Sequence, residues 1–222
     1  MPNIELIASD GHRFQAYQAD LPSPPRGGLV LVQEIFGVNS HIRAVAERLA
    51  GEGYRVLAPA LFDRIEPGIE LGYSGDDVKR GVELASSIGF IEKPMLDVTA
   101  CFEALHQQGL RVGVIGFCWG GTLAWKAAQE LKLSAAVGYY GGQIGSMLEP
   151  QPVAPVLLHF GEQDDHIPLS SVEAIVAKNY PNVEVHTYPA GHGFNCDQRE
   201  SFEPISAQRA WTRSMDFFKA HL

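Results

Sequence analysis

The clearest indication of a reactive side chain in this sequence is a cysteine flanked by glycines. It lies in the run Gly116-Phe117-Cys118-Trp119-Gly120, which has the pattern G-x-C-x-G. In the serine form of this pattern, the nucleophile sits on a tight strand-to-helix turn with its side chain exposed above a sheet. A cysteine there also faces the N-terminus of the next helix, whose dipole favours the thiolate. We interpret Cys118 as a nucleophile; a buried structural cysteine and a Rossmann-like phosphate loop are the alternatives.

A nucleophile of this kind needs an orienting acid and a histidine base, which follow it along the chain in that order. Asp164 and Asp165 come directly after an expected strand, and the residues alone make them nearly equal candidates for the acid. His192 lies between two glycines after the next expected strand, where its imidazole could reach the thiol. His159, His166 and His186 could suggest a metal site, but they lack the helical or short-loop spacing of metal ligands, so we expect no metal site.

Acyl transfer also needs hydrogen-bond donors for the oxyanion. The segment Gln33-Glu34-Ile35-Phe36-Gly37 ends an expected buried strand. We expect the backbone amides of Ile35 and Trp119 to form this oxyanion hole. Glu34 is unusual because a carboxylate at the end of a buried strand is costly unless it is partnered. Either it is a structural acid, or it lies beside the thiol and controls its protonation.

The elements that must position these residues alternate between strand and helix. Residues 4–7 and 14–17, separated by Asp10-Gly11, predict a β-hairpin. Short apolar runs predict strands at residues 29–32, 54–58, 111–115, 135–139, 156–160 and 183–188, and helical spacing predicts helices at about 42–49, 94–105, 119–131, 171–178 and from 205 onward. This alternation predicts one α/β domain over residues 1–222, with a mostly parallel sheet covered by helices on both faces.

The composition excludes several classes of protein. The 222 residues are 45% hydrophobic and carry a net charge of −9, which argues against a disordered chain and a nucleic-acid partner. No apolar run approaches the ~20 residues of a membrane span, and the N-terminal residues do not resemble a signal peptide. The three cysteines form no CxxC pair, so we expect neither disulfides nor zinc, and a reducing cytoplasm as the location.

Five segments in consistent order resemble the dienelactone hydrolase family. They are Gln33–Gly37, Gly116–Gly121, Val137–Gly141, Gly161–Asp164 and Gly191–Phe194. The resemblance covers nearly the whole chain, and it implies the α/β-hydrolase fold, a Cys-His-Asp triad and no cofactor.

Carried over by motif, Cys118 resembles the family nucleophile and His192 its base. Asp164 resembles its acid, because the family acid stands four residues before the proline that is Pro168 here. Glu34 matches the family glutamate, which is believed to hold the resting thiol quiet until substrate displaces it.

The substrate-binding positions depart from the family pattern. Dienelactone hydrolases proper hold the substrate carboxylate with two arginines, and one of them falls at Cys196 here, three residues before Arg199. The other falls in a helix where this chain offers Lys79 and Arg80, and lysine lacks the bidentate fork of arginine. Together with Tyr73, these residues are the candidates for substrate binding.

These features predict a hydrolase of small esters or lactones that works through a thioester acyl-enzyme. The alternatives are a general carboxylesterase or thioesterase on the same triad, a non-catalytic small-ligand binding protein, and a redox sensor that uses Cys118. A cysteine-elbow amidotransferase-like fold is disfavoured, because such folds usually draw the acid from near the histidine. We expect a small-molecule ester or lactone as the partner, no nucleic acid, no membrane, and a monomer or weak homodimer.

Overall fold

A single eight-stranded sheet organises the computed structural model, which describes residues 3–20 and 24–222. The strand order is β1-β2-β4-β3-β5-β6-β7-β8, and every neighbouring pair from β4 to β8 is parallel. The strands are β1 (Asn3–Ile7), β2 (Arg13–Ala19), β3 (Gly27–Val32), β4 (Tyr54–Pro59), β5 (Val112–Phe117), β6 (Ala135–Tyr139), β7 (Val156–Gly161) and β8 (Val183–Tyr188). The predicted mostly parallel α/β sheet is confirmed.

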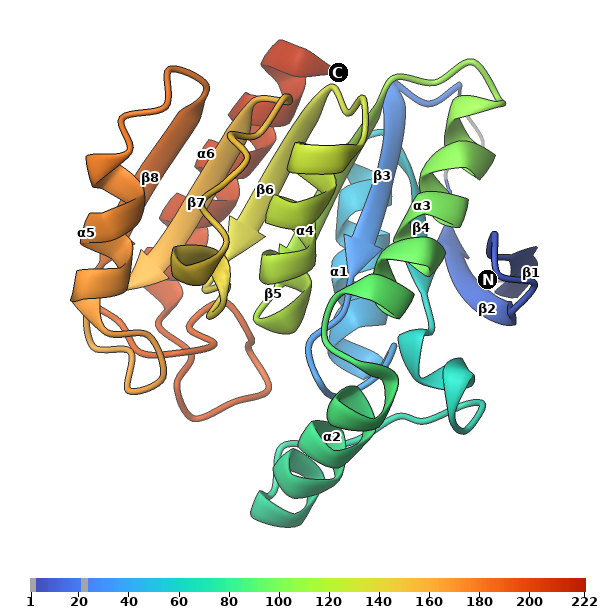
Figure 1. Ribbon diagram of the computed structural model, residues 1–222, viewed down its shortest axis with the longest axis horizontal. Coiled ribbons are helices and arrows are strands. Elements are labelled where there is room, and N and C mark those ends of the chain that lie inside the picture. Colours follow the sequence, from blue (N-terminus) through green and yellow to red (C-terminus); the bar gives the residue numbers. More distant parts are fainter. Residues whose placement is uncertain (1–2, 21–23) are drawn as a thin grey trace.

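Helices cover both faces of this sheet, as predicted. Figure 1 shows α3, α4 and α5 in front of the sheet, with α1 and α6 behind it. The helices are α1 (Ser40–Gly51), α2 (Gly75–Ile88), α3 (Glu92–His106), α4 (Trp119–Glu130), α5 (Leu169–Ala177) and α6 (Pro204–His221), with short 3-10 turns η1 (Leu61–Arg64) and η2 (Ile144–Ser146). Because both faces are covered, β3, β5, β6 and β7 are buried at every residue, which explains their continuous apolar sequences.

The N-terminal hairpin extends the sheet with antiparallel strands. β1 pairs with β2 in the register Leu6↔Phe14, and β2 pairs antiparallel with β4. Gly11 has φ of 85°, a conformation that glycine adopts without strain, and it closes the connection where Asp10-Gly11 predicts a turn. The hairpin lies at the edge of the sheet farthest from β8.

Helix α2 lies outside the two helical layers. Figure 1 shows it projecting beyond the ends toward which the parallel strands point. It begins with a capping box in which Ser74 and Asp77 satisfy each other's backbone amides. Its Gly81 lies so close to the β3–α1 segment, residues 33–37, that an added Cβ would come within 2.1 Å of the Ile35 carbonyl oxygen. A glycine therefore allows α2 to dock on this segment.

Across the described ranges, no helix combines the length and the apolar character needed to cross a membrane.

Candidate active site

Cys118 occupies a sharp turn between β5 and α4. It is the N-cap residue of α4, with φ of 53° and ψ of −113°, a backbone conformation that is uncommon for a residue with a side chain. The glycines around it are required by close packing, because a Cβ on Gly116 would lie 1.9 Å from the Gly120 carbonyl oxygen. Strained backbone of this kind costs about 1–3 kcal/mol and is concentrated at functional sites.

His192 and Asp164 form a hydrogen-bonded pair beside this turn. The Nδ1 atom of His192 lies 2.8 Å from Oδ2 of Asp164, whose side chain is buried. The other carboxylate oxygen accepts hydrogen bonds from the backbone amides of His166 and Ile167, at 2.8 Å and 3.1 Å. Asp165 is exposed. The fold thus brings Asp164, of the two neighbouring aspartates, to the histidine.

The charges of the pair shift the pKa of both groups. Burial raises the pKa of Asp164, but the hydrogen bond to His192 and its charge outweigh burial and leave this pKa below its ordinary value. Burial lowers the pKa of His192, whereas the negative charge of Cys118 and hydrogen bonds to Asp164 and Cys118 raise it to about 10. The surroundings of His192 therefore favour its protonated imidazolium form.

The two amides expected to hold an oxyanion are placed on either side of the cysteine turn. Ile35 lies in the β3–α1 segment, and Trp119 is the first residue of α4. In the part of the chain that the structure describes, neither amide makes a hydrogen bond within the protein. The Trp119 side chain packs inside, where its indole N–H donates to the Phe90 carbonyl oxygen at 2.6 Å.

Glu34 is buried at the end of β3 and is paired with Arg199. Its Oε1 atom accepts from the Arg199 guanidinium at 3.2 Å, while Oε2 has no hydrogen-bond partner among the residues that the structure describes. Arg199 also lies over two aromatic rings, 5.7 Å from the centre of Phe36 and 5.6 Å from that of Tyr73. Burial lowers the pKa of Arg199, but the Glu34 charge raises it above its ordinary value. The guanidinium is therefore a fixed positive charge in this region.

A cleft of about 270 Å³ opens in front of the cysteine. Its lining includes Cys118, His192 and Arg199 together with the side chains of Ile35, Phe36, Val78, Val82 and Ile167. The walls are mostly apolar, and Arg199 contributes a cation. Such a cleft suits a small molecule with an apolar body.

The expected substrate-binding roles of Lys79 and Arg80 are not supported by their positions. Both residues are exposed, and Arg80 forms an ion pair with Glu66 at 2.9 Å. Helix α2 turns Val78 and Val82 toward the cleft instead. Residues one or two positions apart on a helix point in different directions, so docking through Gly81 determines which face meets the cleft.

Tyr73 lies behind the cleft and does not line it. Its ring packs edge-on against Phe36, with 4.7 Å between ring centres, and its hydroxyl accepts a hydrogen bond from Asn39 at 3.2 Å. Of the four expected substrate-binding residues, Arg199 reaches the cleft.

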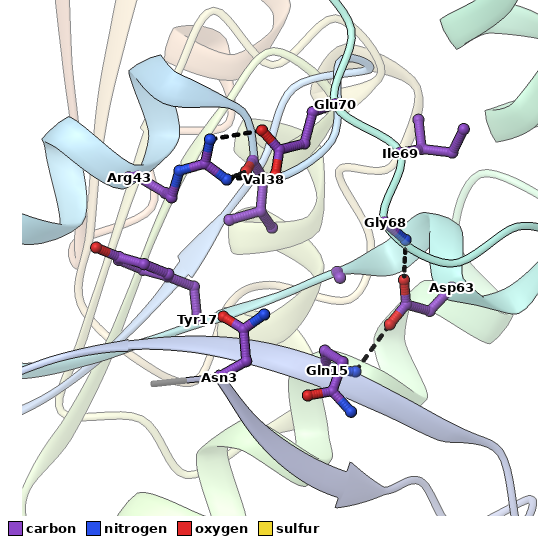
Figure 2. Close-up of a pocket in the computed structure, with 10 residues that line it drawn as sticks. Asn3, Gln15, Tyr17, Val38, Arg43, Asp63, Gly68, Ile69 and Glu70 are labelled. Carbon is purple, nitrogen blue, oxygen red and sulfur yellow. Dashed lines mark hydrogen bonds and ion pairs between the residues drawn. The ribbon is translucent and has the colours of Figure 1, made fainter. Parts of the chain in front are cut away.

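A separate hollow of about 80 Å³ lies between the hairpin and the segment after β4. Figure 2 shows Arg43 paired with Glu70, and Asp63 between the backbone amides of Gln15 and Gly68. Arg43 and Glu70 neutralise each other and Asp63 accepts from backbone amides, so these three groups all have partners. The contacts around this hollow anchor the segment before α2, which also pairs with the β3–α1 segment through Gly37↔Glu70.

Several cleft residues were not identified from the sequence. Val78, Val82 and Ile167 are ordinary apolar residues, and no spacing distinguishes them from core positions. His166 lines the cleft and lies edge-on to His192, with 5.0 Å between ring centres. Its position two residues after Asp164 is a usable signal, because the turn that carries Asp164 must approach His192.

Comparisons with known proteins identify the family of this chain. The sequence profile of the "Dienelactone hydrolase family" matches residues 14–222. A carboxymethylenebutenolidase of Pseudomonas putida is 31% identical over 223 residues, covering 96% of this chain and 94% of its own. A "putative carboxymethylenebutenolidase" of Escherichia coli K12 is 37% identical, covering 97% and 85%.

Solved structures show the same similarity in three dimensions. The crystal structure of a "putative dienelactone hydrolase" from Klebsiella pneumoniae has a TM-score of 0.82 and 32% identity, and the match covers 99% of both chains. The profile match, the curated relatives and this structure confirm the family that the five sequence motifs resemble. The chain therefore belongs to the dienelactone hydrolase family and has the α/β-hydrolase fold.

Proposed function

We propose that this protein hydrolyses small esters or lactones, with Cys118 as nucleophile, His192 as base and acid, and Asp164 as the orienting group. The observation that carries the proposal is the 2.8 Å hydrogen bond between His192 and the buried Asp164, next to a cysteine on a strained turn that opens into a cleft. The names of the curated relatives, which are carboxymethylenebutenolidases, support the same class of reaction.

The first half of the reaction forms a thioester. The Cys118 thiolate attacks the carbonyl carbon, and the carbonyl oxygen becomes an oxyanion held by the amides of Ile35 and Trp119. When the tetrahedral intermediate collapses, the bond to the leaving oxygen breaks, and His192 gives this oxygen a proton. The released alcohol, or the opened end of a lactone, then carries that proton.

Hydrolysis of the thioester completes the cycle. His192, now neutral and oriented by Asp164, removes a proton from water as the water oxygen attacks the acyl carbon. The carbon–sulfur bond breaks, the acid leaves, and the thiolate and imidazolium are restored. Burial of Asp164 supports its role, because a buried charge fixes the tautomer and the orientation of the ring.

Glu34 is proposed to control the protonation of the resting thiol, as its counterpart in the family is believed to do. Two of its features support the role. Its carboxylate is buried, and one oxygen is held by Arg199 while the other has no partner within residues 3–20 and 24–222. Such a carboxylate can exchange a proton with a thiol without being solvated by bulk water.

The shape of the cleft bears on the substrate. Its apolar walls and the position of Arg199 favour a compact substrate whose polar end approaches the guanidinium. Because Lys79 and Arg80 point away, a general carboxylesterase or thioesterase is the second candidate. Turnover of a panel of lactones, simple esters and thioesters separates the two.

Hydrolysis of p-nitrophenyl acetate tests the mechanism. Wild-type protein should release nitrophenol in a burst close to one equivalent, and quenching during the burst should leave an acetyl group on Cys118 in the mass spectrum. Cys118→Ala should abolish turnover, whereas Cys101→Ala, which changes a buried thiol in α3, should retain it. Undiminished activity of Cys118→Ala would refute the mechanism.

A further inference from the structure

A buried group of potential metal ligands lies behind the catalytic cleft. Glu34, His41 and Cys196 each offer one ligand atom, and these atoms all lie within 4.8 Å of one another. They come from the β3–α1 segment, from the first turn of α1 and from the loop after β8. All three residues are at most 2% exposed.

Two polar atoms of this group have no hydrogen-bond partner within the described residues. They are Oε2 of Glu34 and Nε2 of His41. Leaving a buried polar atom unsatisfied costs about 1–3 kcal/mol, and two such atoms beside one thiol are unusual. A bound cation would satisfy both atoms at once.

Neighbouring residues leave both of these atoms available to bind a cation. Nδ1 of His41 lies 3.3 Å from the Asp197 carboxylate, so a proton on Nδ1 leaves the lone pair on Nε2. A histidine that donates its other N–H to a carboxylate is the usual arrangement around zinc. Arg199 holds Oε1 of Glu34 and leaves Oε2 as the free oxygen.

We propose that Glu34, His41 and Cys196 form a binding site for Zn²⁺, with Oε2, Nε2 and Sγ as the ligands. Zinc and the proposed proton exchange with Cys118 then compete for Oε2 of Glu34. A carboxylate oxygen, an imidazole nitrogen and a thiolate are the ligand types that this ion accepts. Two negative ligands balance its charge of two, which favours burial despite the neighbouring Arg199 guanidinium. A fourth position stays available to water.

Zinc binding at this site must displace a proton. Zinc is held by the thiolate form of a cysteine, whereas a free cysteine ordinarily carries a proton at neutral pH. The metal takes the place of that proton, and its release accompanies binding. A surface hollow of about 160 Å³, lined by His41 and Asp197, provides a route of entry.

Sequence patterns do not reveal this site because Cys196 is far along the chain from the other two ligands. His41 lies in α1, whereas Cys196 lies in the loop after β8. Short spacing is the usual signature of zinc ligands, and only the fold brings these three residues together.

Calorimetric titration with zinc chloride tests the proposal in a Cys118→Ser background. This background is needed because Cys118 and His192 could themselves chelate zinc. The full chain should bind one equivalent, and adding Cys196→Ser should weaken binding by at least about 100-fold, since even outer-shell changes cost 10–100-fold. Adding Cys101→Ser, at a buried cysteine outside the group, should leave binding unchanged.

Cobalt(II) supplies a second measurement that reports the ligand itself. A thiolate-to-cobalt charge-transfer band should appear in the Cys118→Ser protein and disappear with Cys196→Ser. His41→Gln keeps the thiol and should weaken binding to a similar degree, which keeps the test decisive if the cysteine variant fails to fold. The proposal is overturned if Cys118→Ser alone abolishes zinc binding, or if the Cys196 and His41 variants bind zinc as well as their parent.

Discussion

Replacing Asp164 with Asn tests how the histidine is oriented. The substitution keeps Oδ1, which accepts from the backbone amides of His166 and Ile167, so the turn retains its shape. It converts the oxygen that lies 2.8 Å from Nδ1 of His192 into an amide donor. Nδ1 must then accept, and the ring proton moves to Nε2, which prevents that atom from taking a proton from water.

The expected loss follows from the burial of this contact. A hydrogen bond to a charged group contributes about 1.5–3 kcal/mol, which corresponds to about 10–150-fold in rate. The wrong tautomer adds to this loss, and removing Asp in the serine-protease triad costs ~10⁴-fold in kcat. We therefore expect kcat for p-nitrophenyl acetate to fall by about 10²–10⁴-fold, with a smaller change in KM.

The pH profile gives an independent readout. The Asp164 hydrogen bond and charge contribute to raising the pKa of His192 to about 10. Without them this pKa falls toward its ordinary value of about 6.5, so the alkaline limb of the rate profile should move to lower pH.

The neighbouring Asp165 provides a matched control because it is exposed. Asp165→Asn should behave as wild type in kcat and in pH profile. Equal losses in the two variants, or an unchanged rate in Asp164→Asn, would show that the reasoning about the pair is wrong.

Three other predictions concern packing and charge. Gly81→Ala should destabilise the protein by about 1–3 kcal/mol and lower kcat, because the added Cβ meets the β3–α1 segment. Gly75→Ala in the same helix is the control, because its Cβ meets nothing within 4 Å, and equal unfolding midpoints of the two variants in urea would contradict the prediction. Arg64→Leu should lower the free energy of unfolding, measured in urea, by about 3–5 kcal/mol, because it leaves a buried carboxylate unpaired. Arg13→Leu, which breaks an exposed ion pair, should lower it by less than about 1 kcal/mol, and similar losses in the two variants would refute the distinction. The pKa of His192 is raised from 6.5 to about 10 by folding, so its stabilising contribution is complete below pH 6.5 and is lost as pH rises to about 10. The melting temperature of wild type should therefore fall more steeply over this range than that of His192→Gln, and parallel curves would contradict the assignment.

The sequence predicts the fold well because its signals are local. Continuous apolar runs identify β3, β5, β6 and β7, whose burial on both faces removes the usual alternation. The hairpin and the N-terminal cap of α1 at Asn39 follow from side chains that act within a few residues. The position of Cys118 follows in the same way, because glycines mark the turn that it occupies.

The parts of the site that the sequence leaves open depend on tertiary contacts. Asp164 contacts His192 and Asp165 does not, and the packing of the turn after β7 determines this difference. Likewise, the choice between Arg80 and Val82 as a cleft residue depends on the rotation of α2, which is fixed by a contact with a distant segment. No local pattern carries this information.

The three residues of the proposed triad follow three different strands, which matters while the protein is being synthesised. Cys118 follows β5, Asp164 follows β7 and His192 follows β8, at the edge of the sheet that is completed last along the chain. Until β8 has joined, the loop that carries His192 cannot bring its imidazole to Cys118, the proposed nucleophile. The proposed triad is thus completed only when the last strand of the sheet has been added, so an unfinished chain lacks the proposed catalytic arrangement.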